Sequence, residues 1–392
     1  MSKNRNSLNS TRVVRLFNAT SLLRTLYREG SCSRTKLAKL THMSPATVSR
    51  ITSELVDQQI IVEKGTGKSN AGRKPVIFQL NYEKIYIAGA CVSRDQMGLA
   101  IANLKGIILA KRYFHPSSLE PESLMNEIVR EFELLVQETN INREYILGLG
   151  LAISGIVDSE QRKLVHSVNL GWQEVQIGEI LENELDLPVL VENDANAAAL
   201  AELWFGEATE VKNLLYIKTD TGVGSGIIYE RNLLTGPRGM AGEIGHLSFI
   251  PNGRKCRCGL EGCLETYVYA PDVIGRYEQE TGQHLENIFH LQEKAREGDS
   301  VARTIINEAA EALSLAVLFA SGLLDLDLVV IGGGWGALGD DFLNLIREKT
   351  AERWERSGIG RTVPVAGSQL GESCDLLGAV GLVIHRWLVS PI

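Results

Sequence analysis

Apolar side chains recur at helical spacings near the start of the chain. Leu16, Ala19, Leu22, Leu23 and Leu26 fall at intervals of three and four residues. This is the pattern of a helix that buries one face and exposes the other. It predicts an amphipathic helix within the first 30 residues.

Two shorter helices are predicted to follow. Ser33 is suited to cap the first, because its hydroxyl can accept a hydrogen bond from a free backbone N–H of the first turn. Ser44 is suited to cap the second, and Pro45 takes its first position, where the missing N–H of proline costs nothing. The turn between them carries His42 where glycine is common, so a left-handed backbone is expected there.

Two apolar runs enclose a polar loop after these helices. Residues 60–62 and 76–80 have the composition of strands, and the loop 65–75 is rich in glycine and basic residues. Three helices followed by a hairpin with a basic tip predict a winged helix-turn-helix. The alternative for the helices is a bundle that binds another protein.

From residue 85 the pattern changes, and it occurs twice. The first unit has strand-like segments at 85–92, 97–102 and 106–114, a helix near 121–138 and a strand at 146–153. The second unit has strands at 188–191, 214–218, 226–229 and 328–334, and helices at 194–205 and 299–322. Two such units predict a duplicated α/β fold with a cleft between two lobes.

Three domains are therefore expected. Residues 1–80 form the winged helix-turn-helix, here called the head. Residues 81–195 form the first lobe, joined by the C-terminal segment 375–392, and residues 196–374 form the second lobe with a dimerisation surface.

The charges are distributed unevenly between head and body. Residues 1–80 hold 14 Lys or Arg against 4 Asp or Glu, whereas the remaining residues hold 26 against 44. A basic head on an acidic body indicates that the head binds a polyanion. A solvated basic face is the alternative.

The second helix of a helix-turn-helix lies in the major groove while the first braces it across the backbone. Small and hydroxylated residues at the start of the second helix can approach base edges or phosphates closely, and an arginine there can reach a guanine. Basic residues of the wing can enter a minor groove. The predicted DNA-binding residues are Arg34, Ser44, Ala46, Thr47, Ser49, Arg50, Arg73 and Lys74.

Three of the six cysteines lie within eight residues. Cys256, Cys258 and Cys263 follow His246, and together they would complete a tetrahedral site for one structural Zn²⁺. Cys256 and Cys258 are poorly placed to form a disulfide with each other. Three free thiols and an unrelated histidine are the alternative.

Four segments, in this order along the chain, resemble the ROK family of sugar kinases and repressors: Glu192–Ala197, Glu243–His246, Cys256–Glu265 and Val330–Gly334. The resemblance covers roughly residues 80–392. The head resembles the DNA-binding domain of the repressor branch, which includes xylose, N-acetylglucosamine and Mlc-type repressors. The resemblance implies lobes of the actin, hexokinase and ribonuclease H type with a zinc loop.

The resemblance also implies a sugar site in the cleft. The residues that would bind sugar hydroxyls are Asn193, Asp194, Glu243, His246 and Glu265. In kinases of the family, the residue matching Asp194 is the base, so here it would be a relic. His246 would bind zinc through one ring nitrogen and a sugar through the other. Gly155 and Asn169 are expected in the same cleft, and a helix N-cap is the structural alternative for Asp194.

The segments that match the phosphate and adenosine loops of the kinases distinguish a kinase from a repressor. Residues 221–226 and 332–334 resemble the second phosphate loop and the adenosine loop of the kinases, although 221–226 would serve equally as a hairpin turn. Kinases carry an Asp-x-Gly-Gly-Thr type turn at the first hairpin, whereas residues 90–95 read Ala-Cys-Val-Ser-Arg-Asp. Close approach of this backbone to a triphosphate is not expected. The chain is therefore predicted to be a repressor rather than an enzyme, with an ATP-dependent sugar kinase as the alternative.

The predicted partners follow from this interpretation. A homodimer, or a tetramer built from it, is expected on an inverted repeat of operator DNA, because helix-turn-helix proteins read half-sites about one turn apart. The effector is a sugar or sugar phosphate, and a membrane transporter protein is the alternative signal. The polar, basic N-terminus and the absence of a run of about 18 apolar residues predict a cytoplasmic protein that is not itself a membrane protein.

Overall fold

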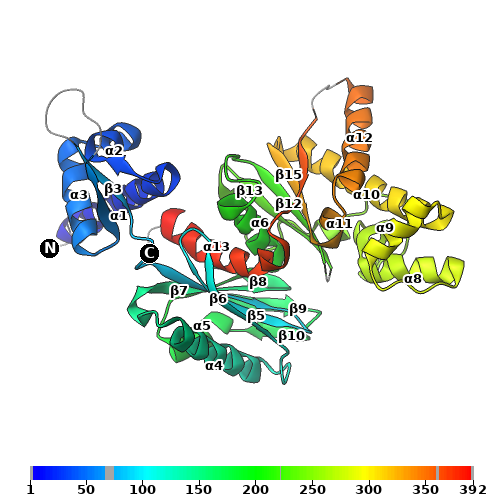
Figure 1. The fold of residues 1–392 in the computed structure, drawn as a ribbon, viewed down its shortest axis with the longest axis horizontal. Helices are drawn as coiled ribbons and strands as arrows, with labels where there is room; N and C mark the ends of the chain where they lie inside the picture. The colour runs from blue at the N-terminus through cyan, green and yellow to red at the C-terminus, as the bar shows by residue number, and fades with distance from the viewer. Residues whose placement is uncertain (1–2, 67–74, 221, 359–361, 390–392) are drawn as a thin grey trace.

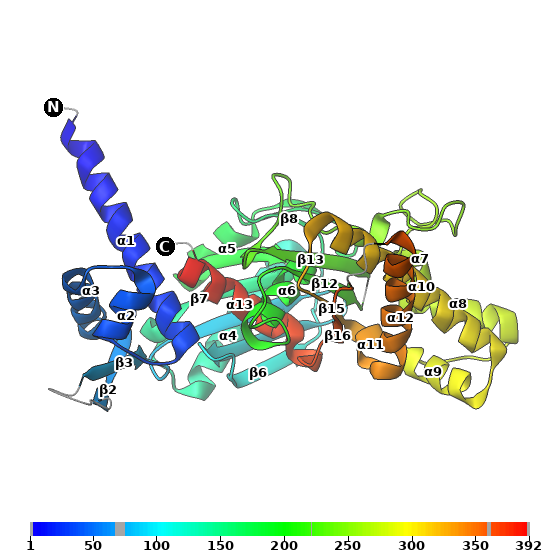
Figure 2. The same ribbon diagram turned by 90° about the horizontal axis from the view of Figure 1, so that it is seen from above.

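The computed structural model describes residues 3–66, 75–220, 222–358 and 362–389. The head lies at one end of the molecule and the helices of the second lobe lie at the other (Figures 1 and 2). The first lobe lies between them, next to the head.

The head combines three helices with a small sheet of order β1-β3-β2. Its elements are α1 (Lys3–Glu29), β1 (Cys32–Ser33), α2 (Arg34–Thr41), α3 (Pro45–Asp57), β2 (Ile61–Thr66) and β3 (Val76–Leu80). Ser33 and Ser44 cap α2 and α3 through their side chains, and His42 between these helices has a φ of 57°. Both predicted caps and the predicted left-handed turn are confirmed.

The first lobe is built on a five-stranded sheet of order β11-β7-β4-β5-β6. Its strands are β4 (Tyr86–Val92), β5 (Met97–Asn103), β6 (Ile108–Phe114), β7 (Ile146–Ile153) and β11 (Val189–Asn193). The helices α4 (Pro121–Thr139) and α5 (Ile177–Leu185) pack on one face of the sheet. A smaller sheet is formed by β8 (Ile156–Asp158), β9 (Lys163–Ser167) and β10 (Trp172–Val175).

The second lobe repeats the same sheet in the order β14-β13-β12-β15-β16. Its strands are β12 (Leu214–Thr219), β13 (Val223–Tyr229), β14 (Asn232–Leu233), β15 (Leu328–Gly332) and β16 (Val365–Gly367). Its helices are α7 (Glu265–Val268), α8 (Ala270–Thr281), α9 (Ile288–Glu297), α10 (Ser300–Leu324), α11 (Gly333–Ala337) and α12 (Asp340–Ser357). Each sheet is an antiparallel meander of three strands extended by two parallel strands. The duplication predicted from the sequence is therefore present, but the strand expected at 188–191 in the second unit is β11 of the first-lobe sheet, where it pairs with β7.

Two helices, α6 (Asp194–Phe205) and α13 (Cys374–Val389), pack against each other between the two sheets. Glycines bring the layers close: a Cβ added to Gly150 of the first-lobe sheet would overlap the carbonyl of Ala379, and one added to Gly226 of the second-lobe sheet would lie 2.6 Å from the carbonyl oxygen of Ala195. Figure 1 shows α13 running from beside the head toward the middle of the body, next to α6.

The helix α10 has the length and hydropathy of a membrane span, although no such span was predicted. Half of its most apolar stretch is buried inside the protein. Ala309, Leu313 and Val317, for example, belong to the core of the second lobe. Its apolar character is explained by this core.

Candidate functional site

A cavity of about 410 Å³ opens between the lobes. It brings together all five predicted ligand-binding residues, Asn193, Asp194, Glu243, His246 and Glu265, and it also contains the two residues expected less strongly, Gly155 and Asn169. Hydroxyl-rich ligands require several polar groups that converge in fixed directions, and this cavity supplies them. The sequence predicted that these residues lie together, and the structure places them in one cavity; their binding of a sugar stays a prediction.

Asn193 and Asp194 stand at the junction where β11 ends and α6 begins. The N-cap of α6 is Asn193, whose side-chain oxygen accepts from the backbone N–H groups of Ala195 and Asn196. The alternative role of Asp194 as the N-cap is therefore wrong: Asp194 is the first residue of the helix. The amide of Asn193 also donates to the carbonyl of Gly155 at 3.0 Å, which leaves Asn193 fixed from two sides.

Glu192 stabilises the junction of β11 and α6 through hydrogen bonds to its buried side chain. Its carboxylate is buried and accepts from Ser159, from the amide of Asn196 and from the backbone N–H of Asn193. Burial raises the pKa of Glu192, against the effect of these hydrogen bonds. The residue supports the site without lining the cavity.

The cavity also contains a buried lysine that reasoning from the sequence missed. Lys218 is near the end of β12, and its Nζ lies 3.1 Å from Asp194 Oδ2 and 2.6 Å from Asp375 Oδ1. Burial by itself lowers the pKa of Lys218, but the charges of Asp194, Asp375 and Asp220 outweigh it and hold that pKa well above its usual value. The only signal in the sequence was a lysine at the end of the apolar run 214–217.

Glu243 and His246 come from the loop after β14. This loop lies directly against β13, because Cβ atoms added to Gly242 or Gly245 would overlap the carbonyls of Ser225 and Val223. Burial raises the pKa of Glu243. The loop therefore presents its polar side chains to the cavity from a close-packed backbone.

The predicted metal ligands are brought together at one edge of the cavity. One ligand atom from each of His246, Cys256, Cys258 and Cys263 lies within 4.8 Å of the others. His246 Nδ1 is 3.8 Å from Cys256 Sγ, and the sulfurs of Cys258 and Cys263 are 3.7 Å apart. Three sulfurs and one imidazole are a donor set that fits a tetrahedral Zn²⁺ and disfavours hard ions such as Mg²⁺.

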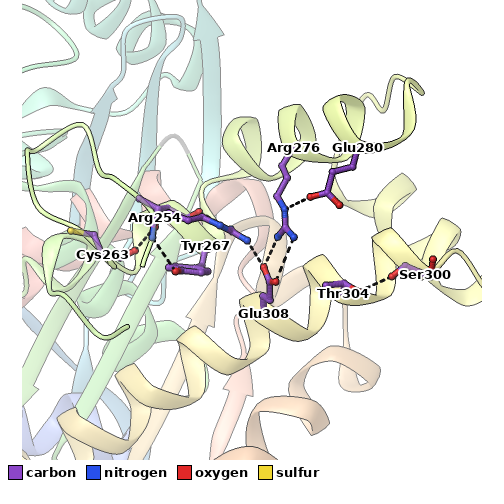
Figure 3. Close-up of polar contacts among 9 residues, drawn as sticks. Arg254, Cys263, Tyr267, Arg276, Glu280, Ser300, Thr304 and Glu308 are labelled. Carbon is purple, nitrogen blue, oxygen red and sulfur yellow. Dashed lines mark hydrogen bonds and ion pairs between the residues drawn. The ribbon is translucent and has the colours of Figure 1, made fainter. Parts of the chain in front are cut away.

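An arginine anchors the cysteine loop to the helices of the second lobe (Figure 3). The backbone N–H of Arg254 donates to the hydroxyl of Tyr267, and its guanidinium lies 4.4 Å from the centre of that ring. The same guanidinium pairs with Glu308 of α10, which also pairs with Arg276 of α8. Arg276 in turn pairs with Glu280, so the loop, α8 and α10 are held by one ionic network.

The first hairpin joins β4 to β5 through a turn that contains Ser93, Arg94 and Asp95. Ser93 closes its turn through hydrogen bonds with Gln96, and the Arg94 guanidinium reaches the carbonyl of Asn169 at 3.5 Å. Cys91 lies in β4, and burial raises its pKa to about 12. In the second glycine segment, residues 223–226 belong to β13 and Thr221 lies outside the described residues.

The predicted DNA-binding residues divide into three groups. Ala46, Ser49 and Arg50 are exposed on α3, as is its N-cap Ser44, and Thr47 is half-buried. Arg50 pairs with Glu54. Arg34 is also half-buried: its Nε donates to Thr52 and its guanidinium lies 4.6 Å from the centre of the Phe78 ring. Arg73 and Lys74 lie outside the described residues.

Two family models match the chain. The model of the ROK family matches residues 89–386, and the model of the MarR family matches residues 18–63. The first covers both lobes and the second covers most of the head.

The chain is similar over nearly its whole length to a xylose repressor from Caldicellulosiruptor bescii, with 31% identity over 97% of this chain and 98% of the repressor. It is 36% identical to a glucokinase from Halalkalibacterium halodurans over 62% of this chain and 76% of the glucokinase. A crystal structure of a ROK family transcriptional regulator, described as a homologue of the E. coli MLC protein, superposes with a TM-score of 0.82 at 24% identity, covering 96% of this chain and 97% of that one. It shares the fold, including the head.

Proposed function

The chain belongs to the ROK family, and we propose that it is a sugar-responsive transcriptional repressor that binds operator DNA through its winged helix-turn-helix. The observation that carries this proposal is the presence, in one chain, of a MarR-like head and a polar cavity between kinase-like lobes. The full-length similarity to a xylose repressor supports it, whereas the similarity to a glucokinase covers the body alone.

The effector is a sugar or a sugar phosphate that binds in the cavity. Asn193 and Glu243 would take adjacent hydroxyls, and Asp194 and Glu265 would accept hydrogen bonds from others. His246 would offer one ring nitrogen to the ligand, since its Nδ1 faces Cys256. Xylose is the first sugar to test, because the relative covering almost all of the chain is a xylose repressor.

One structural Zn²⁺ would be held by His246, Cys256, Cys258 and Cys263. Their soft donor set and mutual distances support this assignment. When bound, the ion would fix the loop that carries His246, so the residues of this loop would orient the ligand with less conformational freedom.

On DNA, α3 would enter the major groove with Ser44, Ala46, Thr47, Ser49 and Arg50 toward the bases and phosphates. Arg34 would bind a phosphate only after leaving Thr52 and Phe78, and Arg73 and Lys74 would act from the wing. A homodimer on an inverted repeat follows from the usual geometry of such heads. A tetramer and a controlling membrane transporter protein are further proposals.

The domain limits that we propose are 1–80, 81–195 with 375–392, and 196–374. The packing of α13 on the first-lobe sheet and of α6 on the second-lobe sheet supports this division. A location in the cytoplasm is proposed, as for other DNA-binding regulators.

An ATP-dependent sugar kinase is the second candidate, and the similarity to a glucokinase favours it. Against it stand the side chains of Ser93, Arg94 and Asp95 at the first hairpin, and the ion pair that engages Asp194 with Lys218. A coupled assay with ATP and a panel of hexoses and pentoses separates the two. Turnover that Asp194→Asn abolishes would establish the kinase.

Two measurements test the repressor directly. Selection from random duplex DNA with the full-length protein is expected to recover an inverted repeat bound in a salt-dependent manner. A thermal-shift panel of sugars and sugar phosphates is expected to identify a ligand that stabilises the wild type and fails to stabilise Glu243→Gln. Recovery of no preferred DNA sequence at any salt concentration would refute the proposal.

A further inference from the structure

Lys218 connects the two central helices at the cavity. Asp194 is the first residue of α6 and Asp375 is the second residue of α13. The Nζ of Lys218, from the second-lobe strand β12, bonds to both carboxylates, and its side chain is only 7% exposed. A lysine has three N–H donors, so one remains for a ligand in the cavity that Lys218 lines.

The same two helices contact the head at their other ends. Trp204, near the end of α6, packs edge-on against Tyr27 of α1 with ring centres 5.2 Å apart. The carbonyl of Leu388, near the end of α13, accepts a hydrogen bond from Arg24 Nε of α1 at 3.0 Å. One hydrophobic cluster contains Leu22 and Leu26 of α1 together with residues of α6 and α13.

Between these ends the helices touch through their backbones. A Cβ added to Gly378 of α13 would lie 2.6 Å from the carbonyl oxygen of Ala197 in α6, and one added to Gly381 would lie 3.3 Å from the carbonyl oxygen of Leu200. Such contacts leave no side-chain layer that could absorb a displacement. The two helices are therefore in direct backbone contact between their cavity ends and the ends that contact the head.

We propose that Lys218 is the residue that couples ligand binding to the head, by tying together the cavity ends of α6 and α13. A ligand hydroxyl that bonds to Asp194 competes with Lys218 for the same carboxylate. The ligand then favours the arrangement of α6, α13 and β12 in which Asp194 can bond to both the ligand and Lys218. A ligand changes DNA affinity only if it prefers one such arrangement over another. This inference rests on the proposed function, and it assigns Lys218 a positioning role in it.

The test removes the ion pair between Lys218 and Asp375 of α13 and leaves the proposed ligand-binding residues unchanged. Asp375→Asn removes one carboxylate from Lys218 and keeps the Lys218–Asp194 pair. Asp341→Asn, an exposed Asp of α12 that pairs with Arg296, is the matched control. For each full-length protein, the affinity for D-xylose and for D-glucose is measured by calorimetry, and the affinity for the selected duplex is measured with and without saturating sugar.

In the wild type and in Asp341→Asn, sugar is expected to change DNA affinity by about tenfold or more, the usual size of an allosteric coupling. In Asp375→Asn the sugar should still bind within about threefold of wild type, while its effect on DNA affinity falls to within about twofold of none. If saturating sugar changed the DNA affinity of Asp375→Asn by the same factor as that of the wild type, the inference would be overturned. A wild type whose DNA affinity no sugar changes would instead refute the proposed function.

If Asp375→Asn does not fold, a second variant tests the contact between α13 and the head instead. Arg24→Gln removes the bond to Leu388 at the far end of α13, and Arg28→Gln, one turn further along α1 and also exposed, is its control. Arg24→Gln is expected to weaken the response to sugar, since the Tyr27–Trp204 contact and the shared hydrophobic cluster remain, while Arg28→Gln retains the full response. Retention of the full response by Arg24→Gln would contradict coupling through α13.

Discussion

The close contact between α6 and α13 can be tested with one methyl group. Gly378→Ala places a Cβ 2.6 Å from the backbone carbon and oxygen of Ala197 and 3.0 Å from the N of Ala198. Ordinary contacts are about 3.5–4 Å, so the helices must separate by roughly 1 Å. Overpacking of this kind costs about 1–3 kcal/mol, against a gain of about 0.5–1 kcal/mol from replacing glycine inside a helix. The midpoints of these ranges give an expected net loss of about 1 kcal/mol.

Gly275→Ala is the matched control, because Gly275 also lies inside a helix, α8, and an added Cβ there has no atom within 4 Å. It is expected to stabilise by about 0.5–1 kcal/mol, so the two substitutions should have opposite signs. The assay is urea unfolding of the full-length proteins followed by circular dichroism, with the midpoints compared. Equal stabilisation by both substitutions would show that α6 and α13 can separate freely, and it would refute the reasoning.

Three further predictions concern the metal loop, the ionic network that anchors it and a buried histidine of α13. Cys258→Ser, or removal of metal with a chelator, is expected to abolish the binding of one zinc per chain, measured by metal analysis, and to lower the melting temperature; wild type purified without zinc would contradict this. Glu308→Gln, which removes the partner of Arg254 and Arg276, should lower the free energy of unfolding by about 1 kcal/mol, since the pairs are partly exposed; an unchanged urea midpoint would contradict the network. Burial lowers the pKa of His385 to about 4, whereas an unfolded histidine binds a proton below about pH 6.5. Stability should therefore fall as pH falls through that interval, by about 2 kcal/mol between about pH 7.5 and pH 5, and His385→Phe should lack this part of the loss in urea unfolding at the two pH values.

Features that depend on neighbouring residues could be predicted from the sequence. The caps of Ser33 and Ser44, the left-handed His42 and the Cys/His group are each defined by residues within one or two turns, or within a single loop. The repeated order of strands was also readable, because each meander has its own apolar runs. The alternative role of Asp194 as an N-cap was wrong because the adjacent Asn193 is equally suited to that role and takes it.

Features that join distant segments could not be predicted. Lys218 meets Asp194 and Asp375, which are separated by 181 residues in the chain, only because the fold stacks α6 on α13. That stacking depends on Gly378, which as a single residue inside an apolar helix reads as a weak helix former and gives no indication of a backbone contact. The partial burial of Arg34 could not be predicted either, because Phe78, which packs against it, belongs to a strand 44 residues further along the chain.

In the proposed function, one chain binds operator DNA and a sugar changes its affinity for that DNA. The most direct test is the dissociation constant of the full-length protein for its selected duplex, measured by fluorescence anisotropy across a range of D-xylose concentrations and at two salt concentrations. We expect affinity that falls with salt, because the protein contacts phosphates, and that shifts by about tenfold or more with xylose or another sugar of the panel. Equal affinity for a scrambled duplex, or affinity that no sugar changes, would contradict it.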